Sequence, residues 1–271
     1  MSTETLAGPL GEIRAASTAS GGTALTSTAA RIVLPLGTKW LTLIPHSFSG
    51  ALVARFNFNP WLTIIKTTDL LATQANITDY STNAQDGSTS TDVTLSGLDT
   101  LANTDAVYVG SHLPFGGIEV DVDATNSTAS VLTGTYWDGS AWTDISLTDG
   151  TTTGGATFGQ DGNITWTVPA AWATTSLNAA VPTAADGVGL LTEQLFWVRL
   201  VVSAALDAST TQNSWIAINR STVYGELTSG LAFEESVTVG PGGICSVTAL
   251  TDAGSGKLIV NVATRQNGRF A

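Results

Sequence analysis

The amino-acid sequence predicts an all-β protein: an antiparallel β-sandwich of jelly-roll type, with a second, smaller β domain and an extended N-terminal arm. Three observations support this prediction. Apolar and polar residues alternate with a period of two along many short runs rich in β-branched and aromatic residues. Gly, Pro, Ser and Asn separate these runs, as in sandwiches and barrels. The 271 residues are also enough to bury a sizeable core.

The expected strands fall into two groups along the chain. The central group gives a sandwich at residues 91–220, and the outer group gives the second domain, formed by residues 31–90 and 221–271. We expect the outer strands to pair with one another, because each set alone is too short to close a core. The runs are 31–35, 38–44, 51–57, 61–66, 106–110, 116–124, 129–137, 141–147, 163–168, 195–203, 214–219, 231–239, 244–250 and 257–264.

Two segments have the composition of irregular structure. Residues 1–30 are rich in Ser, Thr, Ala and Gly, so we expect an arm that becomes ordered only against a neighbour. Residues 83–92 are polar and predict a long loop or a domain boundary. The first residues lack a basic segment followed by an apolar one, so we expect no secretory signal there. No apolar run approaches the roughly 18 residues of a membrane span.

The charge balance limits the possible partners. The formal net charge is −12, and the ten Lys and Arg residues are scattered along the chain. Nucleic acids and anionic membranes are therefore excluded as main partners, because both require clustered positive charge. Charged residues make up only 12% of the chain. A polar surface with so little charge favours packing against copies of the same protein, and we expect a homo-oligomer.

One aromatic stretch, Tyr136-Trp-Asp-Gly-Ser-Ala-Trp-Thr143, predicts a hairpin. Asp138-Gly139 is a strong turn signal, and strand-like runs flank it. If Gly139-Ser140 form the turn centre, or if residues 138–141 form a four-residue loop, Trp137 and Trp142 lie directly opposite each other. A turn centred on Asp138-Gly139 would shift that register. The aromatic pair is thus expected to fix the hairpin. Trp197, in the apolar run 195–203, is expected in a strand that is covered on both faces.

A longer series of aromatic residues and turns carries a family resemblance. Its parts are Val107–Phe115, Tyr136-Trp-Asp-Gly-Ser-Ala-Trp142, Asp149-Gly-Thr151, Phe158, Gly162-Asn-Ile-Thr-Trp166, Pro169-Ala-Ala-Trp172 and Phe196-Trp-Val-Arg-Leu200. Over about residues 91–220 this series resembles structural proteins of tailed-bacteriophage virions. The resemblance implies a β-sandwich module on the virion, on the head or in the tail, assembled in the host cytoplasm, with no reaction attached.

Three carboxylates share one face of an expected strand. Glu119, Asp121 and Asp123 alternate with apolar residues and lie about 7 Å apart at each step. A calcium ion could bridge two of them with loop carbonyl groups. A solvated strand face is the favoured interpretation, and such charges also protect a strand edge from unwanted pairing. The sequence leaves open whether these three residues bind a cation.

No other group of residues indicates catalysis, a cofactor or a metal. His46 and His112 are the only two histidines, and no Gly-x-Ser-x-Gly elbow accompanies them. We expect ordinary turn and loop histidines, and no enzymatic activity. Two His and one Cys do not make a zinc site without a carboxylate. Cys245, the single cysteine, is expected to be a buried, inert thiol.

Two classes of function remain. The first is a non-enzymatic virion component, above all a capsid decoration or cement protein whose partner is the major capsid protein or another virion protein. A tail, neck or fibre-base protein is a variant of this class. The second is a carbohydrate-binding β-sandwich for host attachment. In the first class, we expect assembly contacts at Trp40, Phe56, Phe58 and Trp61, since these aromatics crowd a short segment with few charges. Core packing is the alternative for all four.

Overall fold

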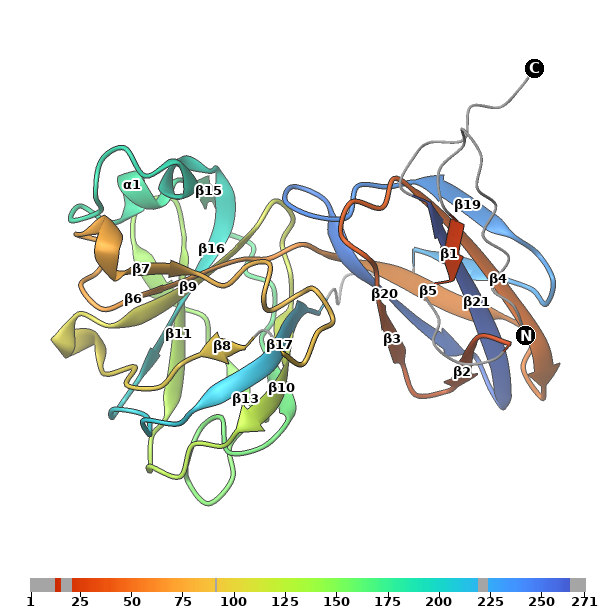
Figure 1. Cartoon of the computed structure of the whole chain (residues 1–271), viewed down its shortest axis with the longest axis horizontal. Helices are drawn as coiled ribbons and strands as arrows, with labels where there is room; N and C mark the ends of the chain where they lie inside the picture. The colour runs from red at the N-terminus through yellow and green to blue at the C-terminus, as the bar shows by residue number, and fades with distance from the viewer. Residues whose placement is uncertain (1–12, 16–20, 91, 219–223, 264–271) are drawn as a thin grey trace. The chain divides into compact units, whose positions relative to one another are not determined.

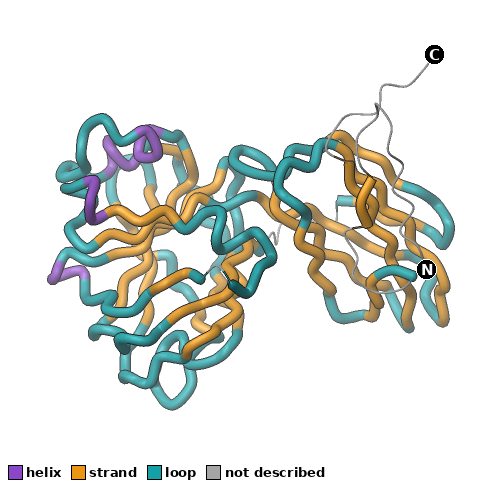
Figure 2. Tube along the Cα trace, viewed as in Figure 1, coloured by secondary structure: helices purple, strands orange, loops and turns teal. Residues whose placement is uncertain are grey.

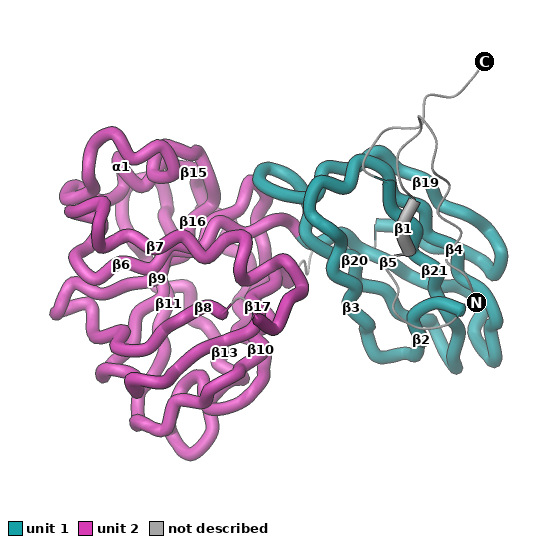
Figure 3. Tube along the Cα trace, in the orientation of Figure 1, with its two compact units in different colours: residues 1–59, 221–271 teal, residues 60–220 magenta. Residues whose placement is uncertain are grey.

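The computed structural model describes residues 13–15, 21–90, 92–218 and 224–263. The chain forms two compact units (Figure 3). Unit 1 combines residues 1–59 and 221–271, and unit 2 is residues 60–220. Strands and loops make up nearly all of each unit (Figure 2). The described helices are α1 (Leu177–Ala180) and three short 3-10 turns, η1 (Gln74–Asn76), η2 (Leu101–Asn103) and η3 (Gly189–Thr192), and none of them could span a membrane.

Unit 1 is a sandwich of two antiparallel sheets. In one sheet, β1 and β2 both pair with β21, which is followed by β4 and β19. The other sheet has the order β18-β5-β20-β3. Leu43 and Val260 from the first sheet pack with Phe56 and Val247 from the second. The strands are β1 (Ile13–Ala15), β2 (Thr23–Thr26), β3 (Ala30–Val33), β4 (Trp40–Ser49), β5 (Ala54–Pro60), β18 (Gly225–Leu227), β19 (Phe233–Ser236), β20 (Ile244–Thr251) and β21 (Ser255–Ala263).

Unit 2 is a larger sandwich. Its seven-stranded sheet has the order β12-β11-β16-β9-β6-β7, with β15 also on β16, and its five-stranded sheet has the order β13-β14-β10-β17-β8 (Figure 1). Ile64 and Val109 from one sheet meet Ile118 and Trp215 from the other. The strands are β6 (Thr63–Thr67), β7 (Ile77–Asp79), β8 (Val93–Thr94), β9 (Ala106–Ser111), β10 (Gly117–Ala124), β11 (Leu132–Trp137), β12 (Trp142–Asp144), β13 (Thr148–Asp149), β14 (Gly162–Thr165), β15 (Thr174–Thr175), β16 (Leu195–Val202) and β17 (Thr211–Ala217).

The seven-stranded sheet is buried on both faces. Its second face, which carries Tyr108 and Trp197, is covered by Leu177 and Val181 of the α1 segment and by Leu191 of η3. This confirms the sequence interpretation of the run 195–203. Trp197 pairs across the sheet with Gly110, where a Cβ atom would lie 2.6 Å from the indole ring. The Trp197 ring can therefore occupy this space only because Gly110 has no side chain.

The predicted all-β sandwich class is confirmed, whereas the segment boundaries differ from those expected. Strand β6, expected in the smaller domain, pairs with β9, so unit 2 begins at residue 60 rather than 91. The expected arm also differs, because β1 and β2 pair with β21 and Leu25 is fully buried in the core of unit 1. Residues 1–12 and 16–20 of that arm lie outside the described residues.

Asn126 fastens the loops at one end of unit 2. Its buried side-chain Nδ2 donates hydrogen bonds to the carbonyls of Thr128 and Thr157 and to Ser130 Oγ, at 2.9–3.1 Å. Its Oδ1 accepts hydrogen bonds from the backbone N–H groups of Thr128 and Asp207. One amide thus joins three loops of unit 2.

The carboxylate of Asp207 completes this junction. It accepts hydrogen bonds from Ser127 Oγ and from the Ser127 backbone N–H, both at 2.6 Å, and from Thr128 Oγ1. The hydroxyl groups of Ser127 and Thr128, followed by the Ser127 N–H, lower the pKa of Asp207 from 3.8 to about 2. The ionised form is therefore the one that the folded loops hold.

Asp207→Asn should flatten the acid dependence of stability. Because the pKa is lower in the folded protein, ionised Asp207 contributes stability above about pH 4 that is lost as the pH falls toward 2. Denaturant unfolding at pH 5, 4, 3 and 2 measures the loss. Asp186→Asn is the control, at an exposed carboxylate with no hydrogen bond in the described structure. Equal slopes in both variants and the wild type would contradict this account.

Gly110→Ala should overpack the seven-stranded sheet. The added methyl group meets the Trp197 ring, and the free energy of unfolding should fall by about 1–3 kcal/mol. Gly189→Ala is the matched control, because its Cβ would meet no heavy atom within 4 Å, and it should be neutral or slightly stabilising. Urea unfolding of the two variants measures both free energies of unfolding. Similar losses at both positions would refute the close approach of Trp197 to Gly110.

Candidate assembly site

The structure separates the four aromatic residues for which assembly contacts were expected. Trp61 is buried and belongs to unit 2, whereas the other three lie in unit 1. Trp40 is half-buried at the start of β4, opposite Ser236 and Ala263. Phe56 is buried and Phe58 is half-buried, both on β5. Phe56 packs in the core of unit 1, which is the alternative that the sequence left open.

Phe56 and Phe58 belong to a four-ring cluster that also contains Tyr224 and Phe233. All six ring pairs have centroids 4.7–6.2 Å apart, and none is stacked face to face. Edge-to-face and tilted contacts of this kind add stabilisation beyond the area they bury. Phe56 is the buried member, and Tyr224 is the outermost, with 54% of its surface exposed. We call these four residues the aromatic cluster.

Two edge strands bring the aromatic cluster together. β18 pairs with β5 and places Gly225 beside Phe56, and the Tyr224 N–H donates to the Phe56 carbonyl at 2.8 Å. β19 pairs with β4 and supplies Phe233 from the opposite sheet. A Cβ atom on Gly225 would lie 2.8 Å from the Phe56 ring, so glycine permits this approach. The cluster therefore lies where the two sheets of unit 1 end.

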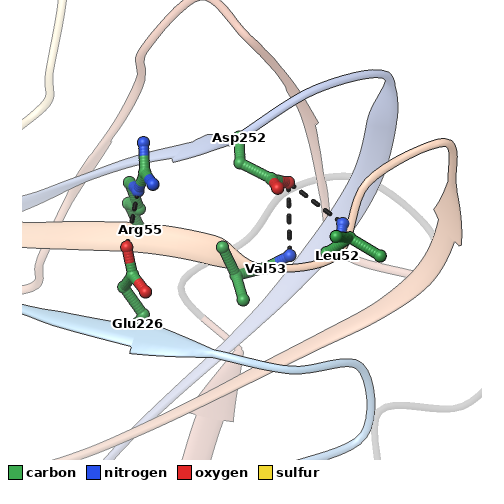
Figure 4. A network of polar contacts seen from close by, with 5 residues as sticks. All are labelled: Leu52, Val53, Arg55, Glu226 and Asp252. Carbon is green, nitrogen blue, oxygen red and sulfur yellow. Dashed lines mark hydrogen bonds and ion pairs between the residues drawn. The ribbon is translucent and has the colours of Figure 1, made fainter.

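Polar contacts fix the loop that precedes β5 (Figure 4). The Asp252 carboxylate accepts hydrogen bonds from the N–H groups of Leu52 and Val53, at 3.0 and 3.2 Å, which lower the pKa of Asp252. Arg55 Nε and Glu226 Oε1 form an ion pair of 2.7 Å that joins β5 to β18. Leu52 is 77% exposed on this fixed loop. Unit 1 thus presents an apolar side chain on backbone that is held in place.

The negative charge is concentrated in unit 2. Sixteen of the 22 Asp and Glu residues, but only three of the ten Lys and Arg residues, fall within residues 60–220. Unit 2 therefore has a formal charge of −13, and unit 1 has a charge of +1. Four of the six large apolar side chains that are exposed in the described part of the chain lie in unit 1: Leu36, Leu52, Tyr224 and Leu231. Charge and exposed apolar surface are thus separated between the units.

The tryptophan hairpin has the expected register. Trp137 pairs with Trp142 across a four-residue loop, and their rings meet edge to face at 5.7 Å. Backbone N–H groups of Ala141 and Ser140, followed by the hydroxyls of Thr143 and Ser140, bind the Asp138 carboxylate and lower its pKa. The predicted aromatic pair and turn are confirmed.

Trp142 is enclosed by its neighbours and does not offer a flat face. The Arg199 guanidinium lies 5.0 Å from its ring centroid, and the buried Tyr108 ring meets it at 5.6 Å. Its indole N–H donates to the carbonyl of Ala180 at 3.1 Å. Burial raises the pKa of Tyr108 to about 12, although the nearby Arg199 charge opposes this shift. This group of rings packs a core and is not arranged to stack on sugars.

The three carboxylates of β10 lie on a solvated face. Asp121 and Asp123 are exposed and Glu119 is half-buried. Thr211 Oγ1 donates to Asp123 at 3.1 Å, and Asn213 Nδ2 lies 3.5 Å from Asp121. β10 pairs with β17 from Ile118 to Ala124 but with β14 only from Gly117 to Val120, so the expected protection of a strand edge fails for Glu119 and fits only the segment with Asp121 and Asp123. Across the described residues, no group of three or more His, Cys, Asp or Glu side chains could hold a metal ion.

The two histidines lie in different units. His46 lies within β4, opposite Lys257, and not in a turn as expected. Its ring nitrogens contact Ser47 Oγ at 2.8 Å and the Gly21 carbonyl at 2.7 Å. His112 is half-buried, and burial lowers its pKa. Within the described part of the chain, no carboxylate hydrogen-bonds either ring. Cys245 is buried, as expected.

No family model and no curated protein matches the chain. Among solved structures, the cryo-EM structure of an arabinofuranosyltransferase from Mycobacteria is similar, with a TM-score of 0.29 and 12% identity. The match covers 89% of this chain and 20% of that chain, so the present chain spans about a fifth of that protein's length. A TM-score this low carries no argument about fold or function.

Tryptophan fluorescence should distinguish packing from sugar recognition. Five of the eight Trp side chains are buried and the other three are half-buried, so acrylamide should quench the folded protein far less than the unfolded chain. Acrylamide is preferable to iodide, which the acidic unit 2 repels. Neither xylan nor dextran should change the emission. Strong quenching of the folded protein that a polysaccharide relieves would instead support a sugar site.

Proposed function

We propose that this protein is a non-enzymatic structural component of a tailed-phage virion, and that it is a capsid decoration protein attached to the major capsid protein through unit 1. The observation that carries the proposal is the separation of charge: unit 2 holds a net charge of −13, while unit 1 is almost neutral and exposes apolar side chains. The sequence resemblance over residues 91–220 supports the virion class.

The charge separation assigns different surroundings to the two units. An acidic unit remains solvated and repels other acidic units, which suits a surface that faces solution. A neutral unit with exposed apolar side chains loses less solvation energy when it is covered by a partner. Unit 1 is therefore the attaching part, and unit 2 projects from the particle.

The aromatic cluster supplies the chemistry of attachment. Tyr and aromatic anchors carry much of the energy of protein interfaces, and Tyr224 is a half-exposed Tyr supported from behind by three Phe rings. A rigid support lowers the entropy lost on binding. Because a capsid repeats its subunits, several copies that also touch one another need only modest affinity at each site.

Attachment to the tail, neck or fibre base uses the same surfaces and differs only in location. A carbohydrate-binding role receives less support, because no Trp side chain in this chain is fully exposed and Trp142 is enclosed by Arg199, Tyr108 and Trp137.

The purified protein should bind stoichiometrically to phage particles assembled without it. Tyr224→Ser and Leu231→Ser, at side chains 54% and 56% exposed in unit 1, should each weaken binding about tenfold. Co-sedimentation with the particles gives the affinity, and particle imaging shows whether the added density lies on the head or the tail.

Val131→Ser is the matched control, because Val131 is 61% exposed but lies in unit 2. It should bind like the wild type. If the protein does not bind to such particles, the virion assignment fails. If Val131→Ser weakens binding as much as Tyr224→Ser, the assignment of unit 1 as the attaching part fails.

A further inference from the structure

The core of unit 2 contains buried polar side chains for which the described part of the chain offers no hydrogen-bond partner. Thr210, Gln212 and Trp215 are each 0% exposed. Four of their atoms have no hydrogen-bond partner among the described residues: Thr210 Oγ1, both amide atoms of Gln212, and Trp215 Nε1. Buried polar atoms almost always have a partner, either protein or ordered water. With Asn213 Oδ1, residues 210–215 contain five such atoms, and this concentration requires an explanation.

A β-bulge directs these side chains to one side. β17 pairs with β10 through Ser214↔Asp121 and Gln212↔Val122, so Asn213 is an extra residue in β17. With this extra residue, Gln212 and Trp215 point to the same face, and Thr210 precedes Gln212 by two positions. All three are fully buried, whereas Thr211, Asn213 and Ser214 are half-buried. The bulge thus places three polar side chains in a row inside the sandwich.

Two other buried polar side chains of unit 2, an amide and an indole, have protein partners, unlike the atoms of this row. Gln85 is as buried as Gln212, but its Nε2 donates to the carbonyls of Leu62 and Ser81 at 2.7 Å. Its Oε1 accepts from the Leu62 N–H at 2.8 Å. The indole N–H of Trp197, also 0% exposed, donates to the Thr175 carbonyl at 2.9 Å. The fold thus pairs one amide and one indole of comparable burial, although the indole N–H of the buried Trp61 also has no partner among the described residues.

The chemistry of the row identifies the class of ligand. Trp215 offers only a donor, while Gln212 and Thr210 offer both donors and acceptors, and all three are neutral. A cation would be repelled by the indole N–H, and an anion has no positive side chain in the row. Water both donates and accepts, and it joins polar atoms about 5–6 Å apart. Successive inward residues of a strand are about 7 Å apart at Cα, which side chains of this length can bridge through water.

We propose that the interior of unit 2 binds one or two ordered water molecules at the β17 bulge, held by Thr210, Gln212 and Trp215. The water satisfies the buried groups and joins the bulge to the loop that ends at Asp207, whose carbonyl accepts a hydrogen bond from the Thr210 N–H. Buried water of this kind is part of a structure and is costly to remove.

Water-selective NMR on the whole protein tests the proposal. The indole N–H of Trp215, assigned by comparison with Trp215→Phe, should show a cross-peak with water whose sign indicates a long-lived contact. The indole N–H of Trp197 is the internal control, because it is equally buried but paired with Thr175. The absence of a water cross-peak at Trp215 would overturn the proposal.

Gln212→Met gives an independent measurement. If water links the three side chains, the change breaks the network, lowers the melting temperature by a few degrees and weakens the water cross-peak of Trp215. If the site is dry, removing an unpaired amide leaves the melting temperature unchanged or raises it, which would contradict the proposal. Gln85→Met shows the loss expected from a fully paired buried amide, and Thr210→Val replaces Gln212→Met if that variant does not fold.

Discussion

Both units depend on the burial of an apolar layer between two antiparallel sheets. The single cysteine excludes an internal disulfide, so packing and strand pairing must supply the stability. In unit 2 this requirement is strongest at the seven-stranded sheet, which is covered on both faces. Trp197 fits there only because Gly110 has no side chain. The Asn126 and Asp207 junction adds the polar contacts that hold the loops at one end of this sandwich.

The separation of charge follows from where the acidic residues can be tolerated. On β10, Asp121 and Asp123 face solvent while Val120 faces the core, so the sandwich carries its charge on alternating positions at little cost to packing. Unit 1 has charges of nearly balanced sign, and Arg55 is paired with Glu226. Its aromatic cluster therefore belongs to a unit with little net charge, although Glu234 and Glu235 directly follow Phe233.

The sequence predicts what is local and leaves out what depends on distant pairing. The register of Trp137 and Trp142 is predictable because the four residues between them define the turn. β6 has the composition of a strand, yet composition does not say that it pairs with β9 instead of the strands before it. β8 and β15 have two residues each, and they are strands only because they pair with β17 and β16. Likewise, Phe56 and Phe58 stand out in the sequence, whereas Tyr224 joins them only because β18 pairs with β5.

The charge of unit 2 also sets how closely copies can be placed if unit 1 attaches them to a repeating surface. A compact unit of 161 residues has a radius of gyration of about 15 Å, and hence a diameter of about 40 Å. The screening length is about 10 Å at 0.1 M salt. Repulsion between neighbouring acidic units is then weak once their surfaces are separated by about 10 Å, and it rises steeply below that spacing. Under the proposed attachment, contacts between copies are therefore expected at the neutral unit 1 and not between the acidic units.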